Sequence, residues 1–274
     1  MKMPTIALLY DFDNTLASSD MQNFTFIPEI LHMEPGEFWD LTNEIFKKWD
    51  MDKVLCYMYC MVNICKEKGI KLTRSLLNEC GKDIKFFEGV TTWFDRINDF
   101  GAKNNVKIEH YIISCGNLEI IEGSSIYRHF KKVYGCEFIY NDEGVAIWPK
   151  TAINYTGKTQ YIYRIKKGII DGNDDIKINQ KIDEKKVPID NMIYFGDGLT
   201  DVPAMITVKD GGGTSIAVYP KGKREKVTKY YEDGRVNYIC KADFSKNSEL
   251  EKIVQLLIQQ AHVKASLEDR KKNL

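Results

Sequence analysis

A short apolar run that ends in two aspartates constrains this chain most strongly. Residues Thr5–Tyr10 have the length and composition of a buried strand, and the segment D-F-D-N-T follows at once. Ligands of parallel α/β sheets bind beyond the carboxyl ends of the strands, and residues i and i+2 of a strand point the same way. We therefore expect Asp11 and Asp13 to face one ligand. Two neighbouring carboxylates repel each other, so the pair predicts a metal or a held proton; an acidic turn that caps a helix is the alternative for this segment alone.

Three later segments place further polar groups where strands or helices are expected to meet the same edge. A second apolar run ends at Ser114 and Gly116, and a third leads directly into the segment G-D-G-L-T-D, which contributes Asp197 and Asp201. Lys158 stands at the expected start of a helix, where a cation and main-chain N–H groups can meet an anion. The spacing around Lys158 does not match a P-loop, because Ala152 replaces the glycine that the motif requires.

In this order, the four segments resemble the haloacid dehalogenase (HAD) superfamily of hydrolases, most closely its phosphoserine-phosphatase-like branch. The D-x-D-x-T motif corresponds to Asp11, Asp13 and Thr15, and the hydroxyl and lysine motifs correspond to Ser114 and Lys158. The acidic motif G-D-G-x-x-D corresponds to Asp197 and Asp201. The second aspartate of the first motif separates the phosphatases of the superfamily from its dehalogenases, so the resemblance implies phosphate chemistry.

The resemblance also implies a division of labour among these residues. Mg²⁺, a hard ion with oxygen ligands, would bind the Asp11 carboxylate, the Asp13 main-chain carbonyl and Asp197. Asp11 would attack phosphorus to form an aspartyl-phosphate, and Asp13 would act first as general acid and then as general base. Ser114, the Gly116 N–H and Lys158 would bind the phosphoryl oxygens. Asp201 would orient Lys158 or a metal-bound water, and Thr15 would orient the loop and Asp13.

The distances between the motifs predict a doubly wound, mainly parallel α/β sheet with an inserted helical cap. About a hundred residues separate Asp11 from Ser114, whereas a simple crossover needs only about a dozen or more. We therefore assign residues 1–16 and 88–274 to a HAD-like Rossmannoid core and residues 17–87 to the cap.

Local patterns predict individual elements of both parts. Apolar periodicity predicts cap helices at 37–49 and 53–68, and Thr73 is a candidate N-cap of a third. In the core we expect a helix from Ser114 through Phe130, short strands or a hairpin at 137–148 and strands at 216–218 and 238–240. We also expect a polar loop at 171–186 and a terminal helix from about residue 248 that frays after 268.

The leaving group is the least constrained part of the prediction. Asp20 stands where the family carries a glutamate that contacts a substrate amine, so Asp20 is a candidate substrate ligand, with an N-cap as the alternative role. Arg74 is the only arginine of the cap but falls later than the family's carboxylate clamp, and Thr200 replaces the usual asparagine of the acidic motif. The sequence predicts a phosphomonoesterase acting on a small phosphorylated metabolite, with phosphoserine or a related amine-bearing phosphate as the candidate substrate. A phosphotransferase or nucleotidase of the same superfamily and a non-catalytic phosphate-binding regulator remain alternatives.

Composition favours neither nucleic acid nor a membrane as a partner. The 39 basic and 39 acidic residues cancel, and no apolar stretch approaches the length of a membrane span. Seven cysteines without a CxxC pair are typical of reduced thiols. We therefore expect a cytoplasmic enzyme.

Overall fold

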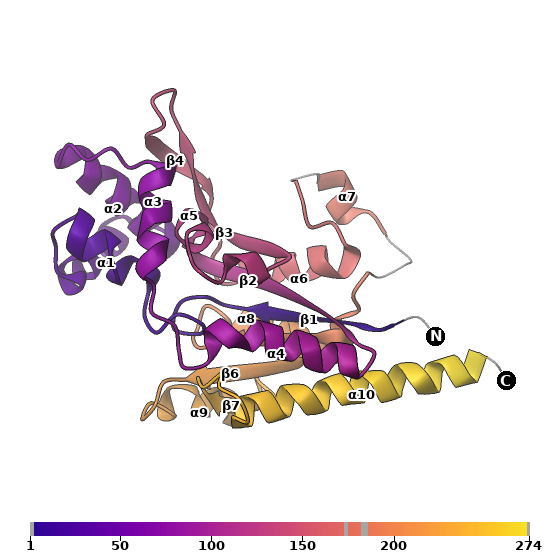
Figure 1. Ribbon diagram of the computed structural model, residues 1–274. Coiled ribbons are helices and arrows are strands. Elements are labelled where there is room, and N and C mark those ends of the chain that lie inside the picture. The colour runs from indigo at the N-terminus through magenta and orange to yellow at the C-terminus, as the bar shows by residue number, and fades with distance from the viewer. Residues whose placement is uncertain (1–2, 173–174, 182–185, 273–274) are drawn as a thin grey trace.

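The computed structural model describes residues 3–172, 175–181 and 186–272. A seven-stranded sheet forms its centre, in the order β4-β3-β2-β1-β5-β6-β7 (Figure 1). All neighbouring strands run parallel except β3 and β4, which form an antiparallel hairpin. The strands are β1 (Thr5–Tyr10), β2 (Lys107–Asn117), β3 (Lys132–Tyr140), β4 (Ala146–Thr151), β5 (Met192–Gly196), β6 (Thr214–Tyr219) and β7 (Tyr238–Lys241).

The central position of β1 makes this strand the reference for the site. It pairs with β2 on one side and with β5 on the other, and its register places Leu9 beside Tyr111 and Tyr194. The chain therefore extends the sheet in opposite directions from β1, which is the arrangement that opens a crevice at the carboxyl ends of the strands. Residues 6–10 are buried because both faces of the strand are covered by helices, as the uninterrupted apolar run predicts.

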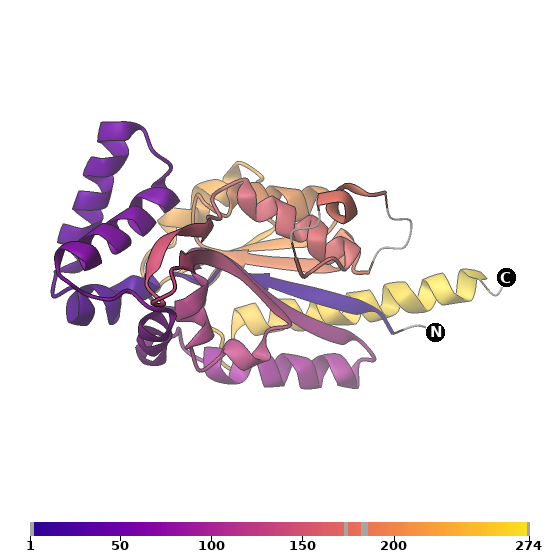
Figure 2. The same cartoon turned by 90° about the horizontal axis from the view of Figure 1, so that it is seen from above.

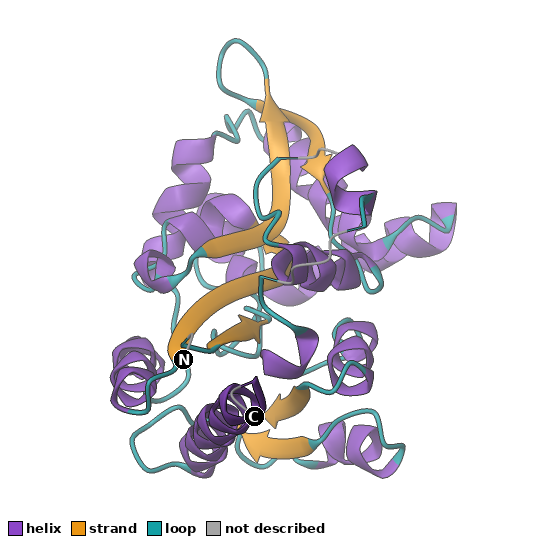
Figure 3. Ribbon diagram, turned by 90° about the vertical axis from the view of Figure 1, so that its right-hand side faces the viewer, coloured by secondary structure: helices purple, strands orange, loops and turns teal. Residues whose placement is uncertain are grey.

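Helices cover the two faces of the sheet, as the views from above and from the end show (Figures 2 and 3). Contacts join α10 to α4 on one side, and α6 to α8 on the other, where α8 also packs against β5 and β6. The predicted α/β fold class is confirmed. The core helices are α4 (Val90–Lys103), α5 (Leu118–Glu122), α6 (Gly157–Lys167), α7 (Asp175–Asn179), α8 (Val202–Asp210), α9 (Glu225–Glu232) and α10 (Glu249–Lys272).

The insertion between β1 and α4 is helical and lies beyond the carboxyl end of β1 (Figure 1). It contains α1 (Pro35–Trp49), α2 (Lys53–Glu67) and α3 (Arg74–Cys80), preceded by the 3₁₀ helix η1 (Met21–Asn23) and the π-helix η2 (Phe26–Ile30). Its two connections to the core lie side by side, because Ala17 and Phe86 form an antiparallel bridge. Thr73 caps α3 as predicted, with Leu76 N donating to Thr73 Oγ1 over 3.1 Å.

Several sequence-based element predictions were wrong. The helix expected from Ser114 to Phe130 is instead the end of β2 followed by the short α5, because the chain past a bulge still pairs with β3 at Asn117 and Cys136. The expected loop at 171–186 contains α7, with 173–174 and 182–185 outside the described residues. Residues 268–272, expected to fray, are helical, and 273–274 lie outside the described residues. The helix α9 had not been expected.

Among the described residues, no helix combines the length and apolar character needed to cross a membrane.

Candidate active site

The carboxyl end of β1 delivers Asp11 and Asp13 to one cavity. Asp11 is buried, and its Oδ1 accepts a hydrogen bond from Phe12 N at 2.8 Å and lies 3.0 Å from Lys158 Nζ. Asp13 Oδ1 accepts from Met21 N at 2.8 Å. One carboxylate oxygen of each aspartate is thus held by the protein. The spacing of two residues brings both side chains to the same place, as the sequence predicts.

Lys158 occupies the first turn of α6 and is wholly buried between carboxylates. Its Nζ lies 2.6 Å from Asp201 Oδ1, which also accepts from the Tyr194 hydroxyl at 2.8 Å. Asp201 Oδ2 accepts from the main-chain N–H groups of Asp197 and Gly198. Burial alone would lower the pKa of Lys158, but Asp11 and Asp201 raise it well above the usual value. The ammonium group therefore stays charged and directed at Asp11.

The end of β2 contributes Ser114 and Gly116, both buried. Gly116 N donates to Ser114 Oγ at 2.9 Å. A Cβ on Gly116 would meet Met21 Cε at 2.1 Å and Asp13 Oδ2 at 2.8 Å, so a side chain at this position would displace the ends of both neighbouring side chains. The main chain of β2 thus passes directly beside the free oxygen of Asp13.

Three carboxylates form a group suited to a divalent cation. Asp11, Asp197 and Asp201 are buried and each offers an oxygen atom, all within 4.8 Å of one another. Oxygen donors of this kind fit a hard ion such as Mg²⁺. The predicted ligands Asp11 and Asp197 belong to the group. Asp201 joins it, although all its hydrogen bonds already go to protein donors.

The charge balance of the group also favours a cation. Burial, reinforced by Asp201, raises the pKa of Asp11 to about 8, despite Lys158. Burial and Asp201 likewise raise the pKa of Asp197 to about 6, although Lys226 of α9 forms an ion pair with it. Two lysines, Lys158 and Lys226, pair with the three carboxylates, and a divalent ion would supply the missing positive charge.

Asp13 does not belong to this group of three carboxylates, and its pKa is raised as well. Burial raises its pKa well above the usual value, and the charges of Asp20 and Asp11 add to the effect. A carboxyl group that is protonated near neutral pH can act as a general acid.

The cavity at this site has a volume of about 480 Å³. Asp20 lies in its wall, where its Oδ1 accepts from Asn14 Nδ2 at 2.9 Å. Asp20 is the N-cap residue of η1, yet its side chain makes no capping hydrogen bond. The geometry thus leaves the capping alternative without support and exposes Asp20 to a ligand. The lining residues are Asp11, Asp13, Asn14, Asp20, Cys115, Asp197, Gly198, Leu199, Thr200, Lys226 and Tyr230.

Two residues considered from the sequence, Thr15 and Arg74, are not among those that line the cavity. Thr15 is buried, but its hydroxyl has no hydrogen-bond partner among the described residues, so no bond orients Asp13 through it. Arg74 does not line the cavity and instead forms ion pairs with Glu122 at 2.7 Å and with Glu137. Arg74 therefore is not placed to clamp a substrate carboxylate.

Sequence reasoning missed Lys226 and Tyr194, which contact the acidic group. Lys226 stands on the unexpected helix α9, far from any motif, and no spacing signalled its approach to Asp197. Tyr194 lay inside the apolar run before the acidic motif. Its position two residues before the first glycine of G-D-G could have suggested a hydroxyl that faces Asp201.

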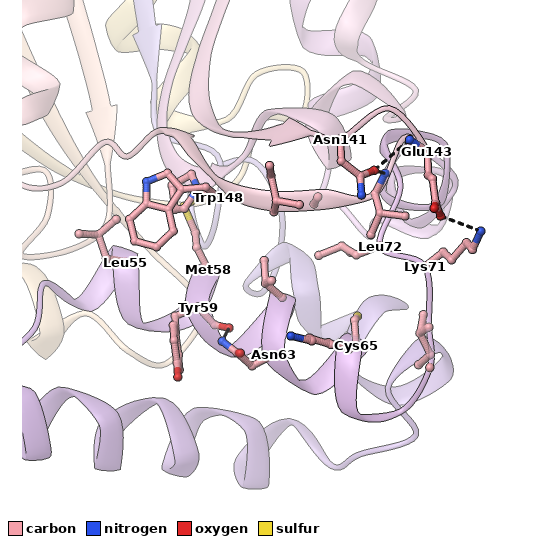
Figure 4. Close-up of a pocket in the computed structure, with 18 of the residues that line it drawn as sticks. Leu55, Met58, Tyr59, Asn63, Cys65, Lys71, Leu72, Asn141, Glu143 and Trp148 are labelled. Atoms are coloured by element: carbon pink, nitrogen blue, oxygen red, sulfur yellow. Dashed lines mark hydrogen bonds and ion pairs between the residues drawn. The ribbon is translucent and has the colours of Figure 1, made fainter.

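A larger cavity of about 560 Å³ lies between α2 and the β3–β4 hairpin and shares no lining residue with the acidic cavity. Its walls are mainly apolar, with Leu55 and Met58 of α2 near Trp148 of β4 (Figure 4). The ion pair between Lys71 and Glu143 lies at its edge. The smaller cavity holds the clustered carboxylates with raised pKa values. Such clusters are typical of reactive sites, so we assign the active site to the smaller cavity.

Comparisons of the sequence and of the structure with known proteins identify proteins that this chain resembles. No family model matches the sequence. A curated relative from Borreliella burgdorferi, described as an uncharacterized protein, is 27% identical in an alignment that covers 89% of this chain and 93% of the relative.

Solved structures resemble the fold over most of the chain. A substrate-bound phosphoserine phosphatase superposes with a TM-score of 0.56 and 15% identity over 92% of this chain and 98% of its own. A phosphoserine phosphohydrolase-like protein from Francisella tularensis superposes with a TM-score of 0.53 and 19% identity, over 86% of this chain and 94% of its own. A HAD family hydrolase from Salmonella enterica serovar Typhi superposes with a TM-score of 0.57 and 16% identity, over 82% of this chain and 66% of its own. The chain therefore shares the fold of these phosphoserine phosphatases and of the HAD family hydrolase.

Proposed function

We propose that this protein is a Mg²⁺-dependent phosphomonoesterase that hydrolyses a small phosphorylated metabolite through an aspartyl-phosphate on Asp11. The observation that carries the proposal is the position of Asp11. One of its oxygens is held by Phe12 N and Lys158, which leaves the other for phosphorus. The free oxygen of Asp13 lies beside the same cavity.

Asp11, Asp197 and the Asp13 main-chain carbonyl are the groups proposed to hold Mg²⁺. The ion would neutralise the phosphoryl oxygens and keep the Asp11 carboxyl ionised. Asp201 is proposed as a positioning residue, because both its oxygens already accept hydrogen bonds from protein groups.

The chain's own residues account for both half-reactions. Asp11 attacks phosphorus while the bond from phosphorus to the leaving oxygen breaks, and Asp13 gives its proton to that oxygen. The ionised Asp13 then takes a proton from the water that attacks the aspartyl-phosphate, which releases inorganic phosphate and regenerates both side chains. Lys158, Ser114 and the Gly116 N–H are proposed to bind the phosphoryl oxygens during both steps.

The proposed substrate carries an amine near its phosphate. Asp20 lines the cavity with no capping role, and one of its oxygens is held by Asn14. Burial raises the pKa of Asp20, so a cation that pairs with it would favour its ionised form.

The test is a screen of phosphorylated amino acids, amino alcohols, sugars and nucleotides with Mg²⁺, using the full chain and the variant Asp11→Asn. We expect release of inorganic phosphate by the wild type and none above background by the variant, because an amide cannot form the acyl phosphate. Substantial turnover by Asp11→Asn would exclude the covalent mechanism. Added alcohol acceptors would distinguish a phosphotransferase, which would yield new phosphate esters in place of inorganic phosphate.

A further inference from the structure

A tyrosine of the helical insertion reaches the main chain of the core at the end of β2. Tyr57 lies on α2 and is 6% exposed, and its hydroxyl donates to the Cys115 carbonyl oxygen at 2.7 Å. Burial raises the pKa of Tyr57 well above the usual value, so the phenol remains a donor. This hydrogen bond therefore links the insertion to the residue between Ser114 and Gly116.

The same carbonyl is held from the core side as well. Cys136 on β3 lies with its Sγ 3.1 Å from the Cys115 oxygen, and that sulfur also accepts from Ile153 N. The Cys115 carbonyl thus has two donors, one from α2 and one from β3.

The peptide between Cys115 and Gly116 transmits this restraint to the site. A peptide unit is planar, and in the trans form its C=O and N–H point in opposite directions. Groups that hold the Cys115 oxygen therefore determine the direction of the Gly116 N–H. In this structure the N–H is directed at Ser114 Oγ, and Gly116 lies against Asp13.

We propose that Tyr57 is a positioning residue that orients the Gly116 N–H for the phosphoryl group. The inference rests on the proposed function, in which that N–H binds a phosphoryl oxygen. It adds that the Gly116 N–H is correctly directed for phosphate only when Tyr57 of α2 is hydrogen-bonded to the Cys115 carbonyl. The insertion thus contributes to phosphate binding as well as, through Asp20, to the proposed contact with the substrate amine.

Tyr57→Phe is the direct test, because it removes only the hydroxyl and keeps the ring that packs edge-on against Trp39. Tyr59→Phe is the matched control: it lies two residues along the same helix, and its hydroxyl has no hydrogen-bond partner among the described residues. Binding of orthovanadate and of Mg²⁺ to both full-length variants would be measured by calorimetry, together with kcat and KM.

We expect Tyr57→Phe to weaken orthovanadate binding and to lower kcat/KM by about three- to tenfold, the scale of one hydrogen bond. Mg²⁺ affinity should not change, and Tyr59→Phe should match the wild type in every measurement. A merely structural role for Tyr57 would lower thermal stability without changing orthovanadate affinity, and that result would overturn the proposal.

Three further outcomes keep the test decisive. If Tyr57→Phe does not fold, Cys136→Ala removes the other donor to the same carbonyl, and the same loss of orthovanadate affinity is expected; its absence would overturn the proposal. A wild type that neither binds orthovanadate nor releases phosphate would refute the proposed function and this inference together. A wild type that does both, with an unaffected Tyr57→Phe, would refute the inference alone.

Discussion

Lys158 and Asp201 form an ion pair in which neither side chain has any exposed area, with Nζ and Oδ1 2.6 Å apart. Asp201 completes its hydrogen bonds with the Tyr194 hydroxyl and with two main-chain N–H groups of the turn after β5. The pair therefore joins the start of α6 to that turn and directs the ammonium group towards Asp11. A buried pair of this kind is costly to break, because the remaining charge cannot reach water.

Asp201→Asn should consequently lower the free energy of unfolding by about 3–5 kcal/mol. In either orientation, the NH₂ group of the asparagine would point at groups that are themselves hydrogen-bond donors. Asp197→Asn should affect stability far less, since the partner of Asp197 is the half-exposed Lys226, but it should abolish tight Mg²⁺ binding. Urea unfolding and calorimetric Mg²⁺ titration of both variants would check this contrast. A stable Asp201→Asn with the Mg²⁺ affinity of Asp197→Asn would make Asp201 a direct ligand.

Asp13→Asn should lower kcat by about 10² to 10⁴, the scale of general acid–base catalysis, while Mg²⁺ affinity is retained. The main-chain carbonyl proposed as the ligand survives the substitution, whereas the proton donor does not. The measurement is kcat for a series of phosphate esters that differ in leaving-group pKa. The loss should be smallest for aryl esters, and a uniform loss would argue against the acid role.

Asp20→Asn tests the substrate class. We expect kcat/KM for amine-bearing phosphates to fall by about 10- to 100-fold, the scale of a hydrogen bond to a charged group. An aryl phosphate without an amine serves as the internal control, and its kcat/KM should hardly change. Equal losses on both substrates would assign Asp20 a structural role in the loop with Asn14.

Chelation with EDTA should abolish turnover, and Mg²⁺ should restore it.

Lys226→Met should tighten Mg²⁺ binding at pH 8 by about two- to fivefold, because it removes a partly exposed cation that pairs with Asp197. Lys229→Met, three residues along α9, is the control, and its Mg²⁺ affinity should equal that of the wild type. Weaker Mg²⁺ binding in Lys226→Met would show that the lysine positions Asp197 for the ion instead of competing with it.

His110 should make stability depend on pH. Burial in the core, aided by His129, lowers its pKa to about 3, whereas an unfolded histidine has a pKa of about 6.5. The unfolded state therefore binds more protons between these values, and the contribution of His110 lowers the free energy of unfolding as pH falls below 6.5. Relative to His110→Asn, the wild type should lose up to about 1.4 kcal/mol per pH unit in urea unfolding between pH 6 and 4. A constant difference would show that His110 accepts a proton in the folded state.

Much of the site could be predicted because its motifs are local. Asp11 and Asp13 share one strand end, and the apolar runs before Ser114 and Asp197 predict neighbouring parallel strands whose ends meet. Gly116 lies beside Asp13 at the end of β2, and its role as an N–H donor to phosphate stays a prediction. These relationships follow from the period of two along a strand and from the direction of parallel strands, both of which are visible in a linear pattern.

The tertiary structure alone decided which distant side chains meet these motifs. Lys226 reaches Asp197 across 29 positions and Tyr57 reaches Cys115 across 58, in each case from a helix whose rotation and packing no local pattern specifies. The same reason places Arg74 against Glu122 and Glu137, away from the cavity. The sequence by itself determined the strand ends and the chemistry that they carry. Packing of the helices decided how those groups are charged, held and reached, because these properties depend on burial and on contacts between segments remote in the chain.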